Sequence, residues 1–445
     1  MDNFFRVAAL PASRLYDPAP RAPSEARGYH PGVVSIDIRT RRATDVRDVE
    51  AAAFLDEELP ALMAERAELA VPAAREMRLR SMALVVDDRT WVLAFDGDRF
   101  LVRPGNGDLP AVHTVVGLDA EQLADLVNDL RTPVGFLAGG DLDMRSGRLE
   151  TFLDWWVVLR SVLDGRAAYA AGDVTFQDTE GEALDLGRSF TLEDDAEVIS
   201  HHLAEAGFIH LRGVFTEDEM RAVSSEMDEA AAGYAPGDGR SWWARTHNGD
   251  ERLVRMQRFQ EVSPTTAQLM TDDRLLGIGR LTEDGHRLGK PGGNPSWVEA
   301  LVKPLGVVEG ISDVPWHKDC SLGSHSYRCC SLTVGISVTS ADANSGQLGV
   351  VAGSHRALTW PGFVRKGLDL PQIQLPTVTG DVTVHCSCTL HMSHPPVTRE
   401  RRVLYTDLTL PTDEPDVYSL NEGKLRKIRE AAPTTVSQQP GHVPG

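Results

Sequence analysis

Two metal-binding residue types stand two positions apart in the segment Trp316-His317-Lys318-Asp319. On an extended strand, side chains two positions apart point to the same side, so the imidazole of His317 and the carboxylate of Asp319 can reach one metal ion. With one more histidine they would make the two-histidine, one-carboxylate arrangement that holds Fe(II) on one side and leaves the opposite positions for reagents. The segment therefore predicts part of an iron site and requires a third ligand from elsewhere in the chain.

A histidine-rich stretch from Gly380 to Pro395 offers that third ligand. A group of basic residues follows it, before the strand-like run Val403-Leu404-Tyr405-Thr406. The histidines of the stretch are His385, His391 and His394, and the basic residues after it are Arg399, Arg401 and Arg402. Each histidine carries the imidazole that such iron sites use, so residue type alone leaves the choice among the three open.

Taken together, these segments resemble the phytanoyl-CoA dioxygenase family of Fe(II)/2-oxoglutarate oxygenases. The shared pattern is the His-x-Asp pair, a downstream Gly-Asp, a Leu-His-x-Ser motif at 390–393 and an arginine eleven positions after the histidine of that motif. A strand and helix at 207–227 and a segment ending in Gly353-Ser354-His355 lie where the family has similar elements. The resemblance covers residues 190 to 411 and implies a jelly roll, the double-stranded β-helix of these enzymes, with flanking helices.

The resemblance also implies roles for individual residues of the chain. The implied iron ligands are His317, Asp319 and His391. Arg402 would pair with the far carboxylate of 2-oxoglutarate, because the planar guanidinium meets a carboxylate with two parallel hydrogen bonds. Ser393 would donate its hydroxyl hydrogen to the same co-substrate.

The family spacing selects His391 among the three histidines, because only His391 has a serine two positions later and Arg402 eleven positions later. His385 and His394 are then expected to be structural histidines that are held by hydrogen bonds. The sequence departs from the family at Pro396, where asparagine is common, and in the unusual segment from Cys386 to Thr389.

The reaction that the resemblance implies uses Fe(II) as cofactor and 2-oxoglutarate and O2 as co-substrates. The 2-oxoglutarate is oxidised to succinate and CO2 while the substrate is hydroxylated. Related halogenases carry a small residue in place of the carboxylate ligand, whereas Asp319 is present here. We therefore expect hydroxylation, or another oxidation such as desaturation, rather than halogenation.

The elements that must position these residues lie in the second half of the chain. From Leu301 to Leu410 the sequence consists of many short strands separated by turns, which is typical of a β-sandwich or jelly roll. The strand predicted at 331–339 alternates polar and apolar residues. Its apolar face should pack in the core, and its polar face either lines a cavity or meets water.

The first half of the chain predicts a smaller α+β domain over residues 45–170. Helices at 45–76, interrupted near Pro60 and Pro72, precede three strand-like runs, a helix that opens at Leu118, a glycine-rich turn at 135–147 and a helix at 149–163. This order resembles a sterol-carrier-protein-like domain, whose fold encloses a hydrophobic tunnel for lipids or acyl-CoA. Trp155 and Trp156 are expected in its core.

The predicted fold class is therefore α+β, with two unequal domains. Residues 1–44 form an extended arm, 45–170 the sterol-carrier-like domain, 171–190 a linker, 191–415 the jelly-roll oxygenase domain and 416–445 a C-terminal tail.

The composition of the chain narrows its expected localisation and its expected binding partners. Its 445 residues carry a formal net charge of -20, which opposes loose binding to nucleic acid or to anionic membrane surfaces. No stretch approaches the roughly 20 apolar residues of a membrane span. The five cysteines are too few and too irregularly placed for a disulfide framework. We expect a cytoplasmic protein, and a homodimer stays open.

The expected substrate is a lipophilic small molecule, such as a terpenoid, steroid, polyketide or acyl thioester, and natural-product biosynthesis is one expected setting. The alternative is a non-catalytic lipid or sterol carrier with an inactive oxygenase-like domain. A third reading keeps the jelly roll and gives it a cupin-like isomerase role with a different metal.

Overall fold

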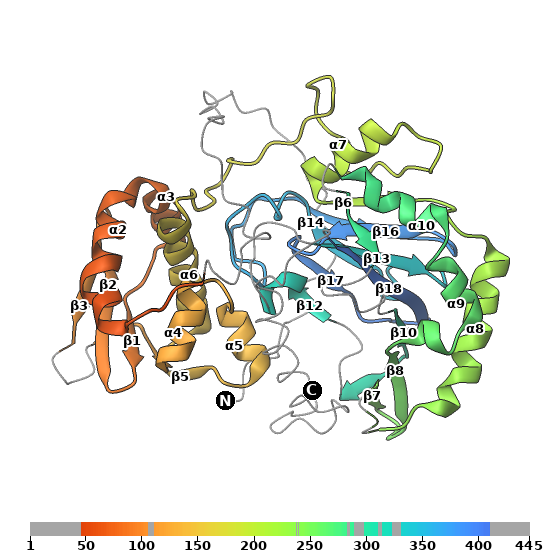
Figure 1. The fold of residues 1–445 in the computed structure, drawn as a ribbon, viewed down its shortest axis with the longest axis horizontal. Helices are drawn as coiled ribbons and strands as arrows, with labels where there is room; N and C mark the ends of the chain where they lie inside the picture. The colour runs from red at the N-terminus through yellow and green to blue at the C-terminus, as the bar shows by residue number, and fades with distance from the viewer. Residues whose placement is uncertain are drawn as a thin grey trace.

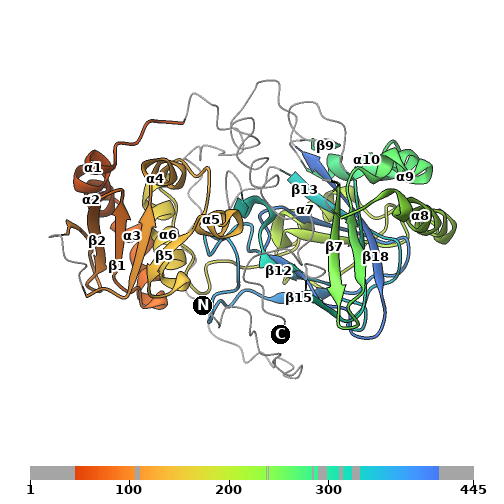
Figure 2. The same cartoon turned by 90° about the horizontal axis from the view of Figure 1, so that it is seen from below.

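The computed structural model describes residues 46–105, 111–236, 238, 240–282, 285–288, 298–309, 314–322 and 331–409. Figure 1 shows an α+β unit, built from the first half of the chain, beside a larger unit rich in β-strands. Figure 2 shows the same two units from below, with helix α5 of the first unit on the side that faces strand β12 of the second. None of the helices in these ranges combines the length and apolar composition of a membrane crossing.

The N-terminal unit begins with a helical segment that breaks twice. Its parts are α1 (Ala51–Ala53), the π-helical turn η3 (Phe54–Glu58), α2 (Leu59–Glu65) and α3 (Ala67–Met77). Pro60 stands in the first turn of α2, where a missing N–H breaks no intrahelical hydrogen bond, and Pro72 lies inside α3. The predicted helical segment is present, but its breaks fall at η3 and at Arg66 rather than at Pro72.

A five-stranded sheet follows, with the order β3-β2-β1-β4-β5. Strand β1 pairs in parallel with β4 and antiparallel with β2, so the sheet is mixed. Its strands are β1 (Met82–Val86), β2 (Arg89–Phe95), β3 (Phe100–Pro104), β4 (Thr114–Leu118) and β5 (Asp143–Ser146). The three predicted strand-like runs correspond to β1, β2 and β3.

Two predictions for this unit differ from the structure. Leu118 ends strand β4 instead of opening a helix, and α4 (Ala120–Val127) begins after Asp119, whose carboxylate accepts a hydrogen bond from the backbone N–H of Gln122. The glycine-rich stretch is no simple turn, because α5 (Pro133–Gly139) and β5 occupy it. Thr132 caps α5 and Pro133 fits its first turn.

Helix α6 (Leu149–Asp164) carries the core of this unit. Trp155 and Trp156 are fully buried in it, which confirms their predicted place in the core. The indole Nε1 of Trp155 donates to the backbone oxygen of Arg80 at 2.7 Å, so the ring fills the core while its polar atom is satisfied.

Residues 171–190, predicted as a linker, pack against the second unit. Phe176, Leu184 and Leu186 lie on a small apolar cluster with Phe208 and Leu348. Phe190 is fully buried and forms a parallel bridge with Leu211.

The second unit opens with α7 (Ala196–Ala206), strand β6 (Phe208–Leu211) and α8 (Glu217–Ala230). The side chains of Thr216 and Glu219 cap the first turn of α8 reciprocally. The further elements are η4 (Ala231–Gly233), β7 (Ser241–Thr246), β8 (Glu251–Met256), η5 (Phe259–Glu261), α9 (Pro264–Leu269), α10 (Asp273–Ile278), η6 (Gly279–Leu281), β9 (Arg287–Leu288), β10 (Glu299–Lys303) and β11 (Val307–Glu309).

Two antiparallel sheets make the remainder of this unit. The larger sheet has the order β11-β7-β8-β10-β18-β13-β16-β6, with β9 paired to β18, and the smaller sheet has the order β12-β17-β14-β15. The elements are β12 (Val314–His317), η7 (Asp319–Leu322), β13 (Ser331–Ser337), β14 (Leu348–Val351), β15 (Gln372–Leu375), β16 (Val382–Cys386), β17 (His391–Ser393) and β18 (Arg401–Thr409). The chain passes repeatedly between the sheets, which is the topology of the predicted double-stranded β-helix.

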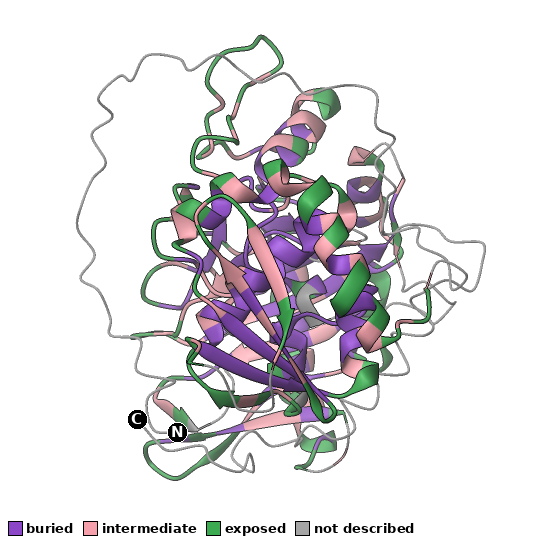
Figure 3. Ribbon diagram, turned by 90° about the vertical axis from the view of Figure 1, so that its left-hand side faces the viewer, coloured by how far each residue is buried: buried purple, intermediate pink, exposed green. Residues whose placement is uncertain are grey.

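The larger sheet has one apolar and one polar face. Leu332, Val334 and Ile336 of β13 belong to the same core cluster as Met220 and Val223 of α8, so helices cover this face. On the other face, the hydroxyl of Thr333 contacts Asp319, which follows strand β12 of the smaller sheet. The polar face of the predicted strand therefore points between the two sheets. Figure 3, viewed from the side of the N-terminal unit, shows buried residues gathered inside the molecule and exposed residues on turns and on the outer faces of helices and strands.

Candidate metal centre

Three side chains from the smaller sheet and the turn beside it converge on one point. The ligand atoms of His317, Asp319 and His391 all lie within 4.8 Å of one another. Oδ1 of Asp319 is 3.3 Å from Nε2 of His317 and 3.5 Å from Nε2 of His391. His317 and His391 are direct partners across the antiparallel pair β12 and β17, so the backbone register brings the imidazoles together.

Asp319 reaches the cluster by a route that differs from the expected one. Strand β12 ends at His317, and Asp319 is the first residue of the 3-10 turn η7. A tight turn, rather than the alternation of an extended strand, therefore brings the carboxylate beside the imidazole.

A hydrogen bond fixes the tautomer of His391. Its Nδ1 lies 3.0 Å from the backbone oxygen of Thr389. Because a carbonyl oxygen only accepts, Nδ1 must carry the hydrogen and donate it, which leaves the lone pair of a neutral ring on Nε2. This arrangement is the usual one for a histidine that binds a metal through Nε2.

The second carboxylate oxygen of Asp319 faces the larger sheet. Thr333 Oγ1 donates to Oδ2 of Asp319 at 2.8 Å, and Nε2 of His385 lies 3.5 Å from the same oxygen. Thr333 is the direct cross-strand partner of His385 on one side and of Asp407 on the other. A polar row across β18, β13 and β16 thus lies beneath the three candidate ligands.

The charge state of Asp319 suits a cation. Burial by itself raises the pKa of this carboxyl, but the neighbouring His391, His317 and His385 outweigh that effect and hold the pKa well below its usual range. Asp319 is therefore ionised, which is the form that binds a metal. About a third of its side chain is exposed, at 35%.

His385 differs from the expectation of a hydrogen-bonded structural histidine. It is 1% exposed, and neither of its ring nitrogens has a hydrogen-bond partner among the described residues. Its ring centroid lies 4.1 Å from that of His391. The contact of its Nε2 with Asp319 is too long for a good hydrogen bond, so His385 is a fourth polar group of the cluster.

The donor set fits iron. Two imidazoles and one carboxylate match the ligand types of the two-histidine, one-carboxylate sites of Fe(II) oxygenases. A cation also suits the converging lone pairs of Nε2 and the ionised Oδ1, which would otherwise repel one another.

Arg402, the expected partner of 2-oxoglutarate, lies away from this cluster. Its guanidinium is 2.8 Å from Oδ1 of Asp228 and donates to the backbone oxygen and hydroxyl of Ser224, both on helix α8. Since side chains alternate along β18, Arg402 occupies the helix-covered face and Arg401 the face of Asp407. The spacing of eleven residues does not determine which face of the strand an arginine occupies.

Two buried cations lie on the inner face instead. Lys303 of β10 and Arg401 of β18 are direct cross-strand partners, and each is 2% exposed. Arg401 donates to the backbone oxygen of Gly346 at 2.8 Å, and its Nε has no hydrogen-bond partner among the described residues. This pair was not among the predicted site residues, although Lys303 directly follows the strand-like run Val298-Glu299-Ala300-Leu301-Val302.

Ser393 stands beside this pair, on the strand that begins with His391. Lys303 Nζ donates to Ser393 Oγ at 2.6 Å and to the backbone oxygen of His394 at 2.5 Å. Burial and the charge of Lys303 lower the pKa of His394, so this histidine is neutral. The structure thus brings the predicted Ser393 to a lysine, and it places Arg402 elsewhere.

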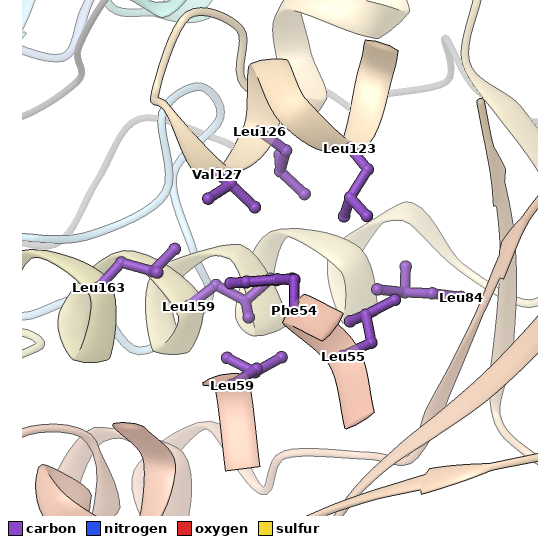
Figure 4. Close-up of a pocket in the computed structure, with 9 residues that line it drawn as sticks. All are labelled: Phe54, Leu55, Leu59, Leu84, Leu123, Leu126, Val127, Leu159 and Leu163. Carbon is purple, nitrogen blue, oxygen red and sulfur yellow. The ribbon is translucent and has the colours of Figure 1, made fainter. Parts of the chain in front are cut away.

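One apolar cavity lies inside the N-terminal unit, where a hydrophobic tunnel was expected. Figure 4 shows nine apolar side chains converging between α4, α6, the first helices and β1. They leave a cavity of about 10 Å³, which is the space of a single water, whereas ligand pockets measure several hundred Å³. A second, open hollow of about 450 Å³ lies on the surface between residues 46–49 and α4, with Arg47, Asp48 and Glu121 on its wall.

Residues 203–403 match the family model described as Phytanoyl-CoA dioxygenase (PhyH). The match includes His317, Asp319 and His391 and begins after the N-terminal unit, which it leaves uncovered. No curated protein matches the chain.

Several solved structures are similar to about half of the chain. One is the α-ketoglutarate-dependent epimerase SnoN of nogalamycin biosynthesis, with 19% identity and a TM-score of 0.35 over 48% of this chain and 81% of SnoN. Another is AviO1 from Streptomyces viridochromogenes, with 19% identity and a TM-score of 0.38 over 50% of this chain and 98% of AviO1. A third is EctD from S. alaskensis, with 18% identity and a TM-score of 0.40 over 54% and 85%.

Proposed function

We propose that this enzyme, an Fe(II)/2-oxoglutarate dioxygenase whose residues 203–403 belong to the phytanoyl-CoA dioxygenase family, holds its iron through His317, Asp319 and His391 and hydroxylates a lipophilic small molecule. The observation that carries the proposal is the convergence of these three ligand atoms within 4.8 Å of one another. When bound, iron and 2-oxoglutarate would supply the O2-dependent oxidation, and the chain would bind, orient and shield the reactants.

Some residues of the site would bind the iron directly, and others would orient those ligands. The Nε2 atoms of His317 and His391 and Oδ1 of Asp319 would face the metal. Thr333 and His385 contact the other carboxylate oxygen, so they favour one orientation of Asp319. Outer contacts of this kind fix the direction of a ligand and commonly change metal affinity by about 10- to 100-fold.

For 2-oxoglutarate, we propose an anchor made of Lys303, Arg401 and Ser393 in place of Arg402. Arg401 Nε has no hydrogen-bond partner among the described residues, and Lys303 lies directly across from Arg401, so the inner face offers two neighbouring buried cations to an anion. The far carboxylate of 2-oxoglutarate is such an anion, and Ser393 keeps one hydroxyl hydrogen to donate because it accepts from Lys303. Arg402 would then serve to tie β18 to α8 through Asp228.

The lipophilic character of the substrate is supported by helix α5. This helix packs beside the turn η7 that begins with Asp319, and it exposes Leu137, whose relative exposure is 43%. Leu137 thus offers one apolar side chain on a helix that packs beside η7, and a lipophilic substrate agrees with it. Hydroxylation is favoured over halogenation because the carboxylate ligand is present.

The test combines a spectrum with product analysis. Fe(II) and 2-oxoglutarate, added to the protein without oxygen, should give a weak visible charge-transfer band that His317→Ala abolishes. With oxygen and a panel of lipophilic compounds, one compound should gain one oxygen atom while succinate is released. A folded protein that shows neither the band nor succinate would contradict the proposal. Lipid that co-purifies with such a silent protein would favour the carrier alternative, and a metal other than iron with turnover that does not need 2-oxoglutarate would favour the isomerase reading.

A further inference from the structure

We propose that the N-terminal unit is a positioning element of the metal centre, which braces the strand of His317 through a contact between Val134 and Gly362. The inference rests on the proposed function in one respect, namely that His317 binds the metal. It gives the N-terminal unit a role in the reaction that differs from carrying a lipid.

The contact begins with a segment of the oxygenase unit that enters the N-terminal core. Between β14 and β15, the chain places Leu358 and Trp360 in the same apolar cluster as Trp156 of α6, with exposures of 1% and 7%. Trp360 Nε1 donates to Oδ1 of Asp154 on α6 at 2.9 Å. The core of the N-terminal unit is thus completed by residues that follow it by about two hundred positions.

Polar contacts hold both sides of this segment. Tyr169 donates its hydroxyl hydrogen to Asp369 at 2.5 Å, and its backbone N–H donates to the backbone oxygen of Leu358 at 3.0 Å. Arg365 forms an ion pair with Glu76 of α3, in which the arginine is 9% exposed. A buried pair of this kind resists separation, because removing one partner leaves the other charge buried alone.

The same segment then pairs with the strand that carries His317. Two residues after Trp360, Gly362 forms an antiparallel bridge with His317, and the N–H of Phe363 donates to the backbone oxygen of Trp316 at 2.8 Å. The backbone of the candidate ligand is therefore hydrogen-bonded to a segment that is anchored in the N-terminal core.

Helix α5 of the N-terminal unit lies on the other side of Gly362. A Cβ atom added to Gly362 would lie 3.1 Å from Cγ2 and 3.4 Å from Cγ1 of Val134, and 3.7 Å from the backbone oxygen of Trp316. Gly362 thus lies between α5 and β12 with little spare room. Because α5 also packs beside η7, the N-terminal unit borders the segments of both His317 and Asp319. Figures 1 and 2 both show α5 next to β12.

If the N-terminal unit moved relative to the second unit, these contacts would also move the strand that carries His317. Packed interiors transmit displacements, because they contain few voids that could absorb a shift. The affinity of the site for its metal should therefore respond to the volume of residue 134 and residue 362.

The experiment measures Fe(II) and Co(II) binding to the full chain by anaerobic titration calorimetry, alongside the charge-transfer band with 2-oxoglutarate. Gly362 is not among the glycines with positive φ, so Gly362→Ala adds volume without backbone strain. Gly362→Ala and Val134→Leu, which enlarge the contact from its two sides, should each weaken metal binding by about tenfold and shift the band. Gly362→Ala combined with Val134→Ala should restore both, since the smaller side chain makes room.

Lys366→Ala provides the matched control, because Lys366 lies in the same segment and is exposed. It should bind metal as the unchanged protein does. Unaltered binding in the two enlarged variants, or a failure of Val134→Ala to rescue a folded Gly362→Ala protein, would overturn the inference. His317→Ala separates this from a failure of the proposed function: if it binds metal normally, the ligand assignment itself is wrong.

Discussion

Thr333 Oγ1 donates a 2.8 Å hydrogen bond to Oδ2 of Asp319, the carboxylate oxygen opposite the one that lies nearest to His317 and His391. The two oxygens of this carboxylate therefore make different contacts. Oδ1 faces the two imidazoles, and Oδ2 is held by the larger sheet. The orientation of the candidate ligand therefore depends on the pairing of β13 with its neighbours as well as on the turn η7.

We expect Thr333→Val to weaken metal binding about tenfold, because Oδ2 of Asp319 loses the donor that orients it. Valine has nearly the same shape as threonine, so the fold should persist. Thr333→Ser keeps the hydroxyl and serves as the control. Anaerobic titration calorimetry measures the affinity, and equal values for valine and serine variants would show that the hydrogen bond does not orient the carboxylate.

The proposed anchor for 2-oxoglutarate can be tested by substituting each of three neighbouring basic residues. Lys303→Met and Arg401→Met should each raise the KM for 2-oxoglutarate by at least tenfold, because each removes a buried cation from the proposed carboxylate site. Arg402→Met should leave that KM unchanged and lower the free energy of unfolding by about 0.5 to 1 kcal/mol, since its partner Asp228 is largely exposed. Initial rates of succinate release measure the KM. The opposite pattern would return the role to Arg402, as the family spacing implies.

A pH prediction follows from Asp154, the residue that holds Trp360. Burial raises the pKa of Asp154 to about 6, although the hydrogen bond from Trp360 lowers it. In the unfolded chain the group ionises near its ordinary pKa, so the folded state binds more protons between the two values and loses stability as pH rises through that window.

Asp154→Asn should remove this loss while keeping an oxygen to accept from Trp360. The variant should be more thermostable than the unchanged protein above pH 6, and the difference should vanish below about pH 3, where the carboxyl is protonated in both the folded and the unfolded state. Thermal unfolding at a series of pH values measures the difference. A variant that is destabilised by the same amount at every pH would mean that the carboxylate is needed for packing rather than penalised by burial.

Gly207 supports the strand of His391 from a distance. It has a φ of +83°, and an added Cβ would lie 2.3 Å from Nδ1 of His355 and 2.6 Å from Oγ1 of Thr389, the residue whose carbonyl oxygen binds His391. Gly207→Ala should therefore destabilise the fold by about 2 to 4 kcal/mol and weaken metal binding.

Gly213→Ala is the control for backbone strain alone. Gly213 also has positive φ, at +61°, but an added Cβ meets nothing within 4 Å. The cost there should be about 1 kcal/mol, with normal metal affinity. Equal losses for both variants, measured by denaturant unfolding, would show that the clash at Gly207 is relieved at no cost.

Several parts of this structure could be predicted from sequence because they depend on local pattern. The alternation of polar and apolar residues at 331–337 predicted the strand β13. The His-x-Asp pair and the Leu-His-x-Ser motif located three side chains that the structure brings together. The choice of Arg402 came from a count along the chain. Because one residue along a strand reverses the face, that count could not reveal that Arg401 and Lys303 share the inner side.

Other features depend on contacts between distant parts of the chain. Helix α5 is short and contains two glycines, Gly135 and Gly139, so its periodicity was too weak to recognise. The position of Trp360 in the N-terminal core has no local signal at all, since an isolated tryptophan in a loop is compatible with many environments. The filled core of the N-terminal unit likewise reflects side-chain packing, which a resemblance in the order of elements does not specify.

The hydrogen bond between Asp154 and Trp360 spans 206 positions of sequence. A ribosome that adds roughly 5 to 20 residues per second needs about 10 to 40 s to pass from one to the other. During that interval the nascent first half has no Leu358 or Trp360 to fill its interior. The chain therefore cannot finish its first unit before most of its second unit has been synthesised, and the two halves must mature together rather than in order of synthesis.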